Sequence, residues 1–484
     1  METQGPKTTI GRRRAIMAGA LLATTALAGV TARGRSAMTG QPLAGPGTTT
    51  FSAPASGPVS FTGTLDRTTV LRGKDGTLRM ELVMSAAPDE ATKSTRLPTD
   101  LVVILDRSGS MDGEKLVYAK AAVRDLVDRL GPEDRFALVT YSNMAQVAIP
   151  LGAMSDQQRS AALSTLGEIR ADGGTNISGG LDMGLDLVDR ARSAGRQPRT
   201  ILISDGLANQ GDPSQEGLVR RATRAARAEY MLSAVGVGAD FNEYLMTALA
   251  DAGTGNYYYL KTGDDLASVF ARELDGARMT VASALAVTIE PAAGVRVVDA
   301  AGYPLESIGS GVAFRPGSLF AGQTRRVWVT LAVPSNDLGE REIGRVALAY
   351  ASGGVRKTLT FGELPRVACV AGEEEFFAGV DSEAWARSAV VDGYNKMQED
   401  VAREVKAGRR DGAMQALRAY RDETGTMNAK LRSPAVAAQL ESVDKLEKEV
   451  GAAFEGDHQP ERQNALSKHK SAEALDQRRA GAKR

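Results

Sequence analysis

A short stretch near residue 100 combines a buried-strand pattern with oxygen-bearing side chains. The five branched apolar residues 101–105 predict a strand in the interior of a parallel sheet. The run leads directly into Asp106, Ser108 and Ser110, which stand in the pattern Asp-x-Ser-x-Ser. Open α/β sheets bind ligands at the carboxyl ends of their strands. We therefore expect one carboxylate and two hydroxyls at the binding edge of such a sheet.

Two later stretches supply oxygens at corresponding places. The glycine-rich loop 172–176 contains Thr175, and the apolar strand pattern 200–204 is followed by Asp205. Hydroxyl and carboxylate oxygens, with neither Cys nor His among them, suit a hard cation such as Mg²⁺, Ca²⁺ or Mn²⁺. The predicted metal site consists of Asp106, Ser108, Ser110, Thr175 and Asp205. Helix capping by the serines and a turn at Asp205 is the alternative interpretation, but it leaves the agreement of three separate stretches unexplained.

In residue types and order, this set resembles the metal-ion-dependent adhesion site of a von Willebrand factor type A domain of the exported bacterial type. The resemblance covers roughly residues 98–276. It implies that Ser108, Ser110 and Thr175 contact the metal and that Asp106 and Asp205 act mostly through bound water. It also implies that a carboxylate of a partner protein completes the metal's ligand shell.

The pattern of the same segment predicts its fold. Between residues 98 and 276, buried strands alternate with amphipathic helices, which indicates a doubly wound, mostly parallel α/β sheet of Rossmann-like type. The stretches 135–141 and 146–150 are close enough in sequence to form an antiparallel pair at one edge of this sheet.

The flanking segments have different patterns. Residues 59–97 and 277–372 alternate apolar and polar positions, which is typical of half-buried strands. Two strands alone cannot bury a core, so we expect those of 59–97 to complete a β-sandwich formed by 277–372, with the α/β domain inserted between them. Residues 373–456 predict a helical region, whereas 457–484 are so highly charged that we expect disorder.

The first residues predict an export signal. Arg12, Arg13 and Arg14 precede an uncharged, weakly apolar stretch at 15–32, so residues 1–37 are predicted to be a signal peptide. The arginines resemble a twin-arginine signal, although Ala15 stands where a bulky residue is usual, and the export pathway is left open. A retained anchor is the alternative to cleavage. Residues 38–58, rich in Gly, Pro, Ser and Thr, predict a flexible linker.

Composition excludes several classes of function. Lys plus Arg and Asp plus Glu both number 59, so net charge gives no argument for a nucleic-acid partner. Cys369 is a single cysteine, so the chain can form no internal disulfide. Both histidines, His458 and His469, lie in the polar tail, which argues against a Ser/His/Asp triad or a zinc enzyme.

The sequence therefore predicts a binding protein rather than an enzyme. We expect an export-directed module, in the periplasm, cell envelope or outside the cell, that captures an Asp or Glu of a partner protein through a divalent ion. One alternative is an assembly or chaperone-like factor for an envelope complex. Another is a metal-dependent hydrolase, which would also need a general base. Membrane contact through a retained signal or through the basic tail also stays open.

Overall fold

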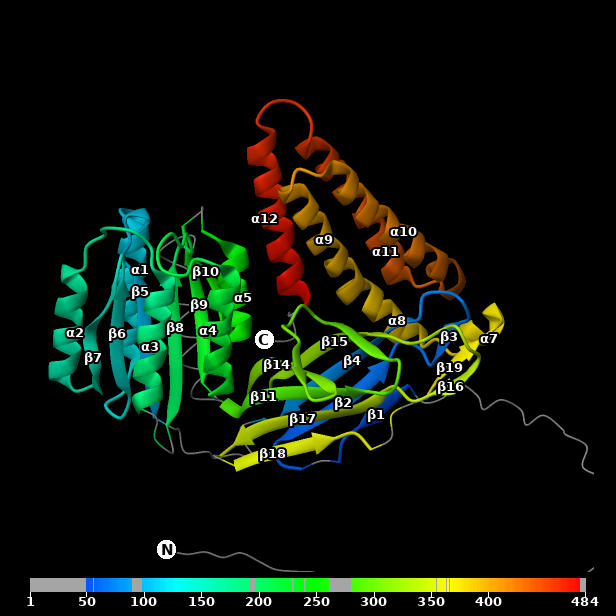
Figure 1. Cartoon of the computed structure of the whole chain (residues 1–484), viewed down its shortest axis with the longest axis horizontal. Helices are drawn as coiled ribbons and strands as arrows, with labels where there is room; N and C mark the ends of the chain where they lie inside the picture. The colour runs from blue at the N-terminus through cyan, green and yellow to red at the C-terminus, as the bar shows by residue number, and fades with distance from the viewer. Residues whose placement is uncertain are drawn as a thin grey trace, which may run out of the picture. The chain divides into compact units, whose positions relative to one another are not determined.

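The computed structural model describes residues 49–54, 56–88, 98–191, 193, 196–228, 230–238, 241–260, 280–353, 355–362, 364 and 366–478 (Figure 1). The predicted signal peptide at 1–37, most of the predicted linker and the last six residues lie outside this set. In the part of the chain that is described, no helix has both the length and the hydropathy needed to cross a membrane.

A mostly parallel sheet forms the centre of the domain that contains the predicted metal site. Its strands are β5 (Thr99–Asp106), β6 (Arg135–Tyr141), β7 (Ala145–Ala153), β8 (Gln197–Ser204), β9 (Met231–Val237) and β10 (Thr254–Leu260). Among the described residues the strand order is β10-β9-β8-β5-β6-β7. Neighbouring strands are parallel except β6 and β7, which are antiparallel. The predicted sheet type and antiparallel edge pair are both confirmed.

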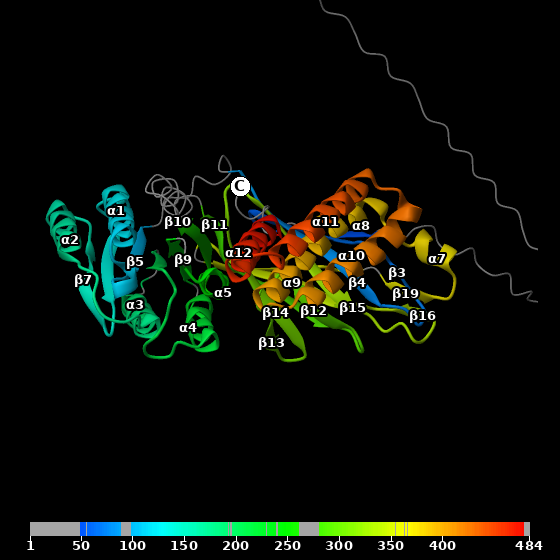
Figure 2. The same ribbon diagram turned by 90° about the horizontal axis from the view of Figure 1, so that it is seen from above.

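Helices cover both faces of this sheet (Figure 2). They are α1 (Glu114–Arg129), α2 (Asp156–Glu168), α3 (Ile177–Ala191), α4 (Gln215–Arg227) and α5 (Glu243–Ala252). Every residue of β5 is buried, and its side chains alternate between two cores. Val103 packs with residues of α1 and α2, whereas Ile104 packs with residues of α3, α4 and α5. A continuous apolar run therefore suits this strand, because both of its faces are covered.

Two further sheets share a hydrophobic core and form a β-sandwich. In the described residues the first has the order β1-β2-β4-β15-β12, with β1 (Thr50–Ser52), β2 (Val59–Leu65), β4 (Thr77–Ala86), β15 (Thr324–Ala332) and β12 (Arg296–Ala300). The second has the order β13-β14-β11-β17-β18, with β13 (Glu306–Ile308), β14 (Gly311–Phe320), β11 (Thr280–Pro291), β17 (Gly344–Ser352) and β18 (Val355–Thr360). A small sheet of β16 (Gly339–Arg341), β19 (Val367–Val370) and β3 (Thr69–Leu71) completes the β-structure described.

Strands from both sides of the α/β domain pair within one sheet of the sandwich. β4 is antiparallel to β15 along its length, with Leu82 opposite Val327 and Met80 opposite Val329. These four side chains are buried in the shared core. The alternating strands that precede the α/β domain thus bury their apolar faces with strands that follow it.

Strand β1 lies inside the segment predicted to be a flexible linker, so that prediction is wrong for residues 50–52. Phe51 is buried in the sandwich core, and its ring forms a T-shaped pair with that of Phe361 at a centroid distance of 4.6 Å. Phe361 also stacks on Phe61 at 4.3 Å. A single aromatic side chain anchors an otherwise polar segment here, because a buried ring removes a large apolar area from water.

The C-terminal region is helical, as predicted. Its elements are α7 (Glu373–Ala378), α8 (Ser382–Arg387), the π-helical turn η3 (Ser388–Gly393), α9 (Tyr394–Lys406), α10 (Arg410–Leu431), α11 (Pro434–Ala453) and α12 (Gln459–Arg478). Helix α12 replaces the disorder expected from residue 457 onward. Its small residues Ser467 and Ala474 are fully buried, and the Ser467 hydroxyl donates to the Ala402 carbonyl of α9 at 2.8 Å. Small side chains let the helix pack closely with few large apolar groups.

The pairing of β4 with β15 predicts how fragments of the chain will behave. A fragment of residues 99–371 lacks β2 and β4, so it should expose the apolar edge of β15 and aggregate. A fragment of residues 98–276 should be monomeric and should melt cooperatively. Size-exclusion chromatography and thermal unfolding followed by circular dichroism would measure both. A monomeric, cooperatively melting 99–371 fragment would contradict the insertion of one domain into the other.

Candidate metal centre

Asp106 is the last residue of β5 and is fully buried. Its Oδ1 accepts a hydrogen bond from the Ser108 backbone N–H at 2.8 Å. Its Oδ2 accepts from the Tyr141 hydroxyl at 3.1 Å and from the Ser204 hydroxyl at 2.6 Å. The donors come from the following loop and from the ends of β6 and β8, the two strands on either side of β5. These bonds fix the carboxylate at the carboxyl edge of the sheet.

The Asp-x-Ser-x-Ser loop and the glycine-rich loop are joined by backbone hydrogen bonds. The Gly109 N–H donates to the Gly173 carbonyl at 2.9 Å, and the Asp172 N–H donates to the Arg107 carbonyl at 2.8 Å. Within the first loop, the hydroxyl oxygens of Ser108 and Ser110 lie 3.1 Å apart. Ser108 is buried and Ser110 is exposed. The two hydroxyls therefore lie together where the loop opens to solvent.

Thr175 connects the glycine-rich loop to the loop after β8. Its backbone N–H donates to Asn209 Oδ1 at 2.8 Å, and its carbonyl accepts from the backbone N–H groups of Asn209 and Gln210 at 3.1 and 3.2 Å. The Thr175 side chain is almost fully buried. All three predicted loops are thus held against one another at a single edge of the sheet.

Asp205 immediately follows β8 and is also fully buried. Its Oδ2 accepts from the Lys115 ammonium of α1 at 3.1 Å, and its backbone carbonyl accepts from the Asn242 N–H at 2.9 Å. Lys115, Tyr141 and Ser204 lie outside the metal site predicted from the sequence. Tyr141 and Ser204 are the last residues of two predicted strands beside β5, and that position could have identified them. Nothing in the local sequence pattern points to Lys115.

The electrostatics of the edge fit a cation. Burial raises the pKa of the Asp106 carboxyl, hydrogen bonds from Ser204 and Ser108 oppose that rise, and the nearby charge of Asp205 adds to it. A positive ion beside two buried carboxylates relieves this repulsion. No group of three or more His, Cys, Asp or Glu side chains suited to a metal occurs within the described ranges, so a metal at this edge would also need hydroxyl ligands. Neutral hydroxyls and carboxylates are oxygen ligands of the kind that Mg²⁺ accepts.

The same domain is found in known proteins. Residues 100–272 match the family model of the von Willebrand factor type A domain. The solved structure described as von Willebrand factor type A from Catenulispora acidiphila superposes with a TM-score of 0.61 at 17% identity, covering 86% of this chain and 97% of that one. The chain contains a von Willebrand factor type A (vWA) domain. Because the superposition extends well beyond residues 100–272, the likeness in fold also includes regions that flank the vWA domain.

Curated relatives match part of the chain. The uncharacterized protein YfbK of Escherichia coli (strain K12) is 30% identical over 201 residues, which are 41% of this chain and 35% of that protein. The inter-alpha-trypsin inhibitor heavy chain H4 of Homo sapiens is 30% identical over 162 residues, which are 32% of this chain and 17% of that protein. The chain thus spans about a third or less of the length of these two relatives.

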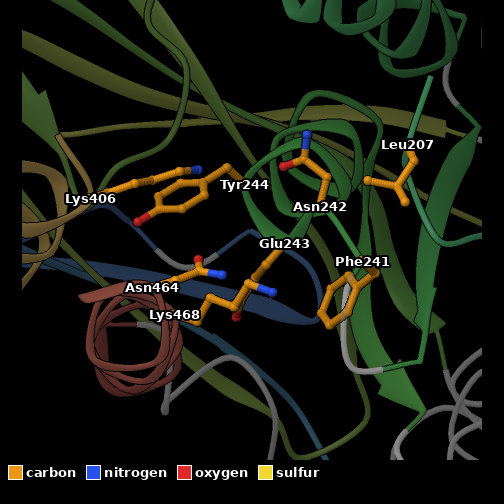
Figure 3. A pocket seen from close by; sticks show the side chains of 8 residues that line it. All are labelled: Leu207, Phe241, Asn242, Glu243, Tyr244, Lys406, Asn464 and Lys468. Atoms are coloured by element: carbon orange, nitrogen blue, oxygen red, sulfur yellow. The ribbon is translucent and has the colours of Figure 1, made fainter. Parts of the chain in front are cut away.

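A pocket of about 240 Å³ adjoins the Asp205 loop of the vWA domain (Figure 3). It is lined by Leu207, Phe241, Asn242, Glu243, Tyr244, Lys406, Asn464 and Lys468. The Lys406 ammonium lies 4.1 Å from the centre of the Tyr244 ring, and the hydroxyl oxygens of Tyr244 and Ser467 lie 3.1 Å apart. Helix α5, which starts beside Asn242, therefore contacts both α9 and α12.

Glu243 in this pocket has a perturbed acidity. It is 9% exposed, and burial raises the pKa of its carboxyl from 4.5 to about 7, while the positive charge of Lys468 opposes the rise. The folded state therefore holds this proton more tightly than the unfolded state. The resulting stabilisation is fully present below about pH 4.5 and is lost as the pH rises through about 7.

Asp106→Asn tests the metal assignment with the least change of shape. The amide can still accept from Ser108, and the hydroxyls of Tyr141 and Ser204 can turn to accept its N–H. Opposite unit charges about 4 Å apart interact by on the order of 4 kcal/mol at an effective dielectric constant of about 20. We expect Mg²⁺ affinity, measured by titration calorimetry, to fall at least about tenfold. The melting temperature without metal should change little.

Asp182→Asn is the matched control, because Asp182 is a carboxylate of α3 that pairs with Arg221 at 3.0 Å instead of standing at a strand end. Its Mg²⁺ affinity should equal that of the parent protein. If the parent, Asp106→Asn and Asp182→Asn all bind Mg²⁺ equally well, the metal site lies elsewhere. If none of the three binds Mg²⁺, the metal assignment is wrong.

Glu243→Gln tests the burial of that carboxyl. The neutral amide carries no buried charge at high pH, so the variant should gain about 1–3 kcal/mol of stability relative to the parent between pH 5 and pH 8. Urea unfolding at the two pH values would measure the gain. Glu216→Gln on α4, where the side chain is 85% exposed, should show no such dependence. A difference that is the same at both pH values would mean that Glu243 ionises normally.

Proposed function

We propose that this protein is an exported, divalent-metal-dependent binding module that captures an acidic side chain of a partner protein at the edge of its vWA domain. vWA domains commonly mediate protein–protein interaction and adhesion. The observation that carries the proposal is the convergence of three loops. Backbone hydrogen bonds join the loop of Ser108 and Ser110 to the glycine-rich loop, and the Thr175 backbone bonds to the loop after β8, at the edge where Asp106 and Asp205 are buried.

The residues divide into two roles in this proposal. Ser108, Ser110 and Thr175 would hold the ion through neutral oxygens, and Asp106 and Asp205 would balance its charge from buried positions. A divalent ion bound there supplies positive charge for an anionic ligand. Neutral direct ligands favour this use, since they leave more of the ion's charge uncompensated than direct carboxylate ligands do. The natural complement is therefore the carboxylate of an Asp or Glu side chain.

Binding fits the site better than hydrolysis does. A hydrolase would need a general base within hydrogen-bond reach of an attacking water. Asp106 already accepts three hydrogen bonds, and Asp205 is paired with Lys115. Both histidines lie at or near α12, with side chains more than 70% exposed. The hydrogen bonds of Asp106 and the ion pair of Asp205 give both buried carboxylates a role without proton transfer, and we infer a non-enzymatic role.

Export is part of the proposal and rests on the sequence of the first residues. The basic cluster at 12–14 and the uncharged stretch at 15–32 have the composition of an export signal. A partner in the periplasm, in the cell envelope or outside the cell follows from that location.

A pull-down with matched baits tests the proposed function. The parent protein and Asp182→Asn, each with Mg²⁺, should retain the same envelope protein. The parent with EDTA, and Thr175→Val with Mg²⁺, should not retain it. Val keeps the shape of the almost fully buried Thr175 but removes its hydroxyl, so the fold should persist, as a melting curve would check.

Changing each exposed Asp or Glu of the captured protein to its amide should then identify one residue whose loss abolishes binding. Retention in EDTA, or a complex that tolerates every such change, would show that the contact is made on another surface.

A further inference from the structure

Lys115 places a positive charge inside the candidate metal centre. It is the second residue of α1, and its Nζ donates to Asp205 Oδ2 at 3.1 Å. The Asp205 side chain is fully buried, and that of Lys115 is 23% exposed. This is an ion pair with a carboxylate that the proposed function assigns to the metal. An ammonium in that position competes with any bound cation for the negative charge of Asp205.

The backbone confines the lysine to this position. Gly238, just after β9, has a φ of +84°. A Cβ built at Gly238 would lie 2.6 Å from Lys115 Cε and 3.1 Å from Cδ, so the lysine stem occupies the space that a side chain would need. Most exposed lysines move among many rotamers. Here the stem lies against backbone and the head is paired, which favours a fixed role at the site.

Charge shows what that role is. Asp106 and Asp205 are buried, whereas the neighbouring Asp112, Glu114 and Asp172 are exposed and screened by solvent. With both buried carboxylates ionised, they and the ammonium together carry one net negative charge. A divalent ion changes this to one net positive charge, whereas without Lys115 it would bring the centre only to neutrality.

We propose that Lys115 is an affinity-setting residue of the metal centre: it neutralises Asp205 when no ion is bound, weakens the binding of the divalent ion alone, and leaves the loaded centre with a positive charge for an anionic ligand. The inference rests on the proposed function, because it takes the centre to be a metal site. Lys115 is not one of the predicted metal ligands, yet its charge would contribute to the preference of the site for an acidic partner.

Lys115→Met tests the inference with Mg²⁺ alone as the probe. Methionine keeps an unbranched stem against Gly238 and removes the charge. In titration calorimetry the variant should bind Mg²⁺ about fivefold or more tightly than the parent, because one repulsive unit charge is gone. In the absence of metal its melting temperature should fall, because Asp205 loses its partner in a buried position. The rise in melting temperature on adding Mg²⁺ should accordingly be larger than in the parent.

Two further variants separate charge from packing. Lys115→Gln keeps a hydrogen-bond donor for Asp205 without the charge, and it should also bind Mg²⁺ more tightly; it serves the same test if the methionine variant fails to fold. Lys115→Arg keeps the charge and should bind Mg²⁺ as the parent does. Weaker or unchanged Mg²⁺ binding in both neutral variants would overturn the inference.

The outcome is distinguishable from a failure of the proposed function. If the parent binds Mg²⁺ and Asp106→Asn does not, while the neutral Lys115 variants match the parent, the metal centre stands and the role of Lys115 is refuted. If the parent binds no divalent ion by calorimetry, the proposed function fails first and the role of Lys115 fails with it.

Discussion

The site depends on keeping one carboxylate satisfied inside the protein. An ionised group without partners is costly to bury, and Asp106 is tolerated because the loop after β5 and the ends of both neighbouring strands donate to it. The same bonds fix the relative positions of β5, β6 and β8 at their carboxyl ends. The converging loops are built on that frame, and their backbone groups bond to each other before any ligand is considered. Pre-organisation of this kind keeps the conformational cost of binding low.

Much of this arrangement could be predicted from sequence, because it is encoded locally. The apolar run of β5, the glycines before Thr175 and the strand that ends at Ser204 each determine their own conformation, and the topology of a parallel sheet then brings their ends together. Lys115 could not be found in that way. Its contact with Asp205 joins the start of α1 to the loop after β8, and it also depends on the bare backbone of Gly238. The contacts of Lys115 with Asp205 and with Gly238 join residues far apart in the sequence, and no recognisable motif links them.

The two wrong assignments share a physical cause. Mean composition is a poor guide where a few side chains decide the packing. The segment around Phe51 is polar on average, yet its one ring reaches the core of the sandwich. Helix α12 is highly charged, yet small residues on one face let it approach α9, and Lys470 pairs with Glu449 at 3.1 Å. In both segments, the free energy of a few buried contacts outweighs the average tendency toward disorder.

The pairing of β4 with β15 also bears on the order in which the chain can fold. The contact between Arg326 and Glu81 spans 245 positions, and closing a flexible loop of that length is slow and entropically costly. A vWA domain that folds first would turn most of the loop into one rigid body. The early strands would then need to search less space to find β15. During synthesis, the apolar faces of β2 and β4 stay exposed until the ribosome has made the later strands that cover them. In that order of folding, the inserted domain would serve as a scaffold for the sandwich around it, in addition to carrying the predicted binding edge.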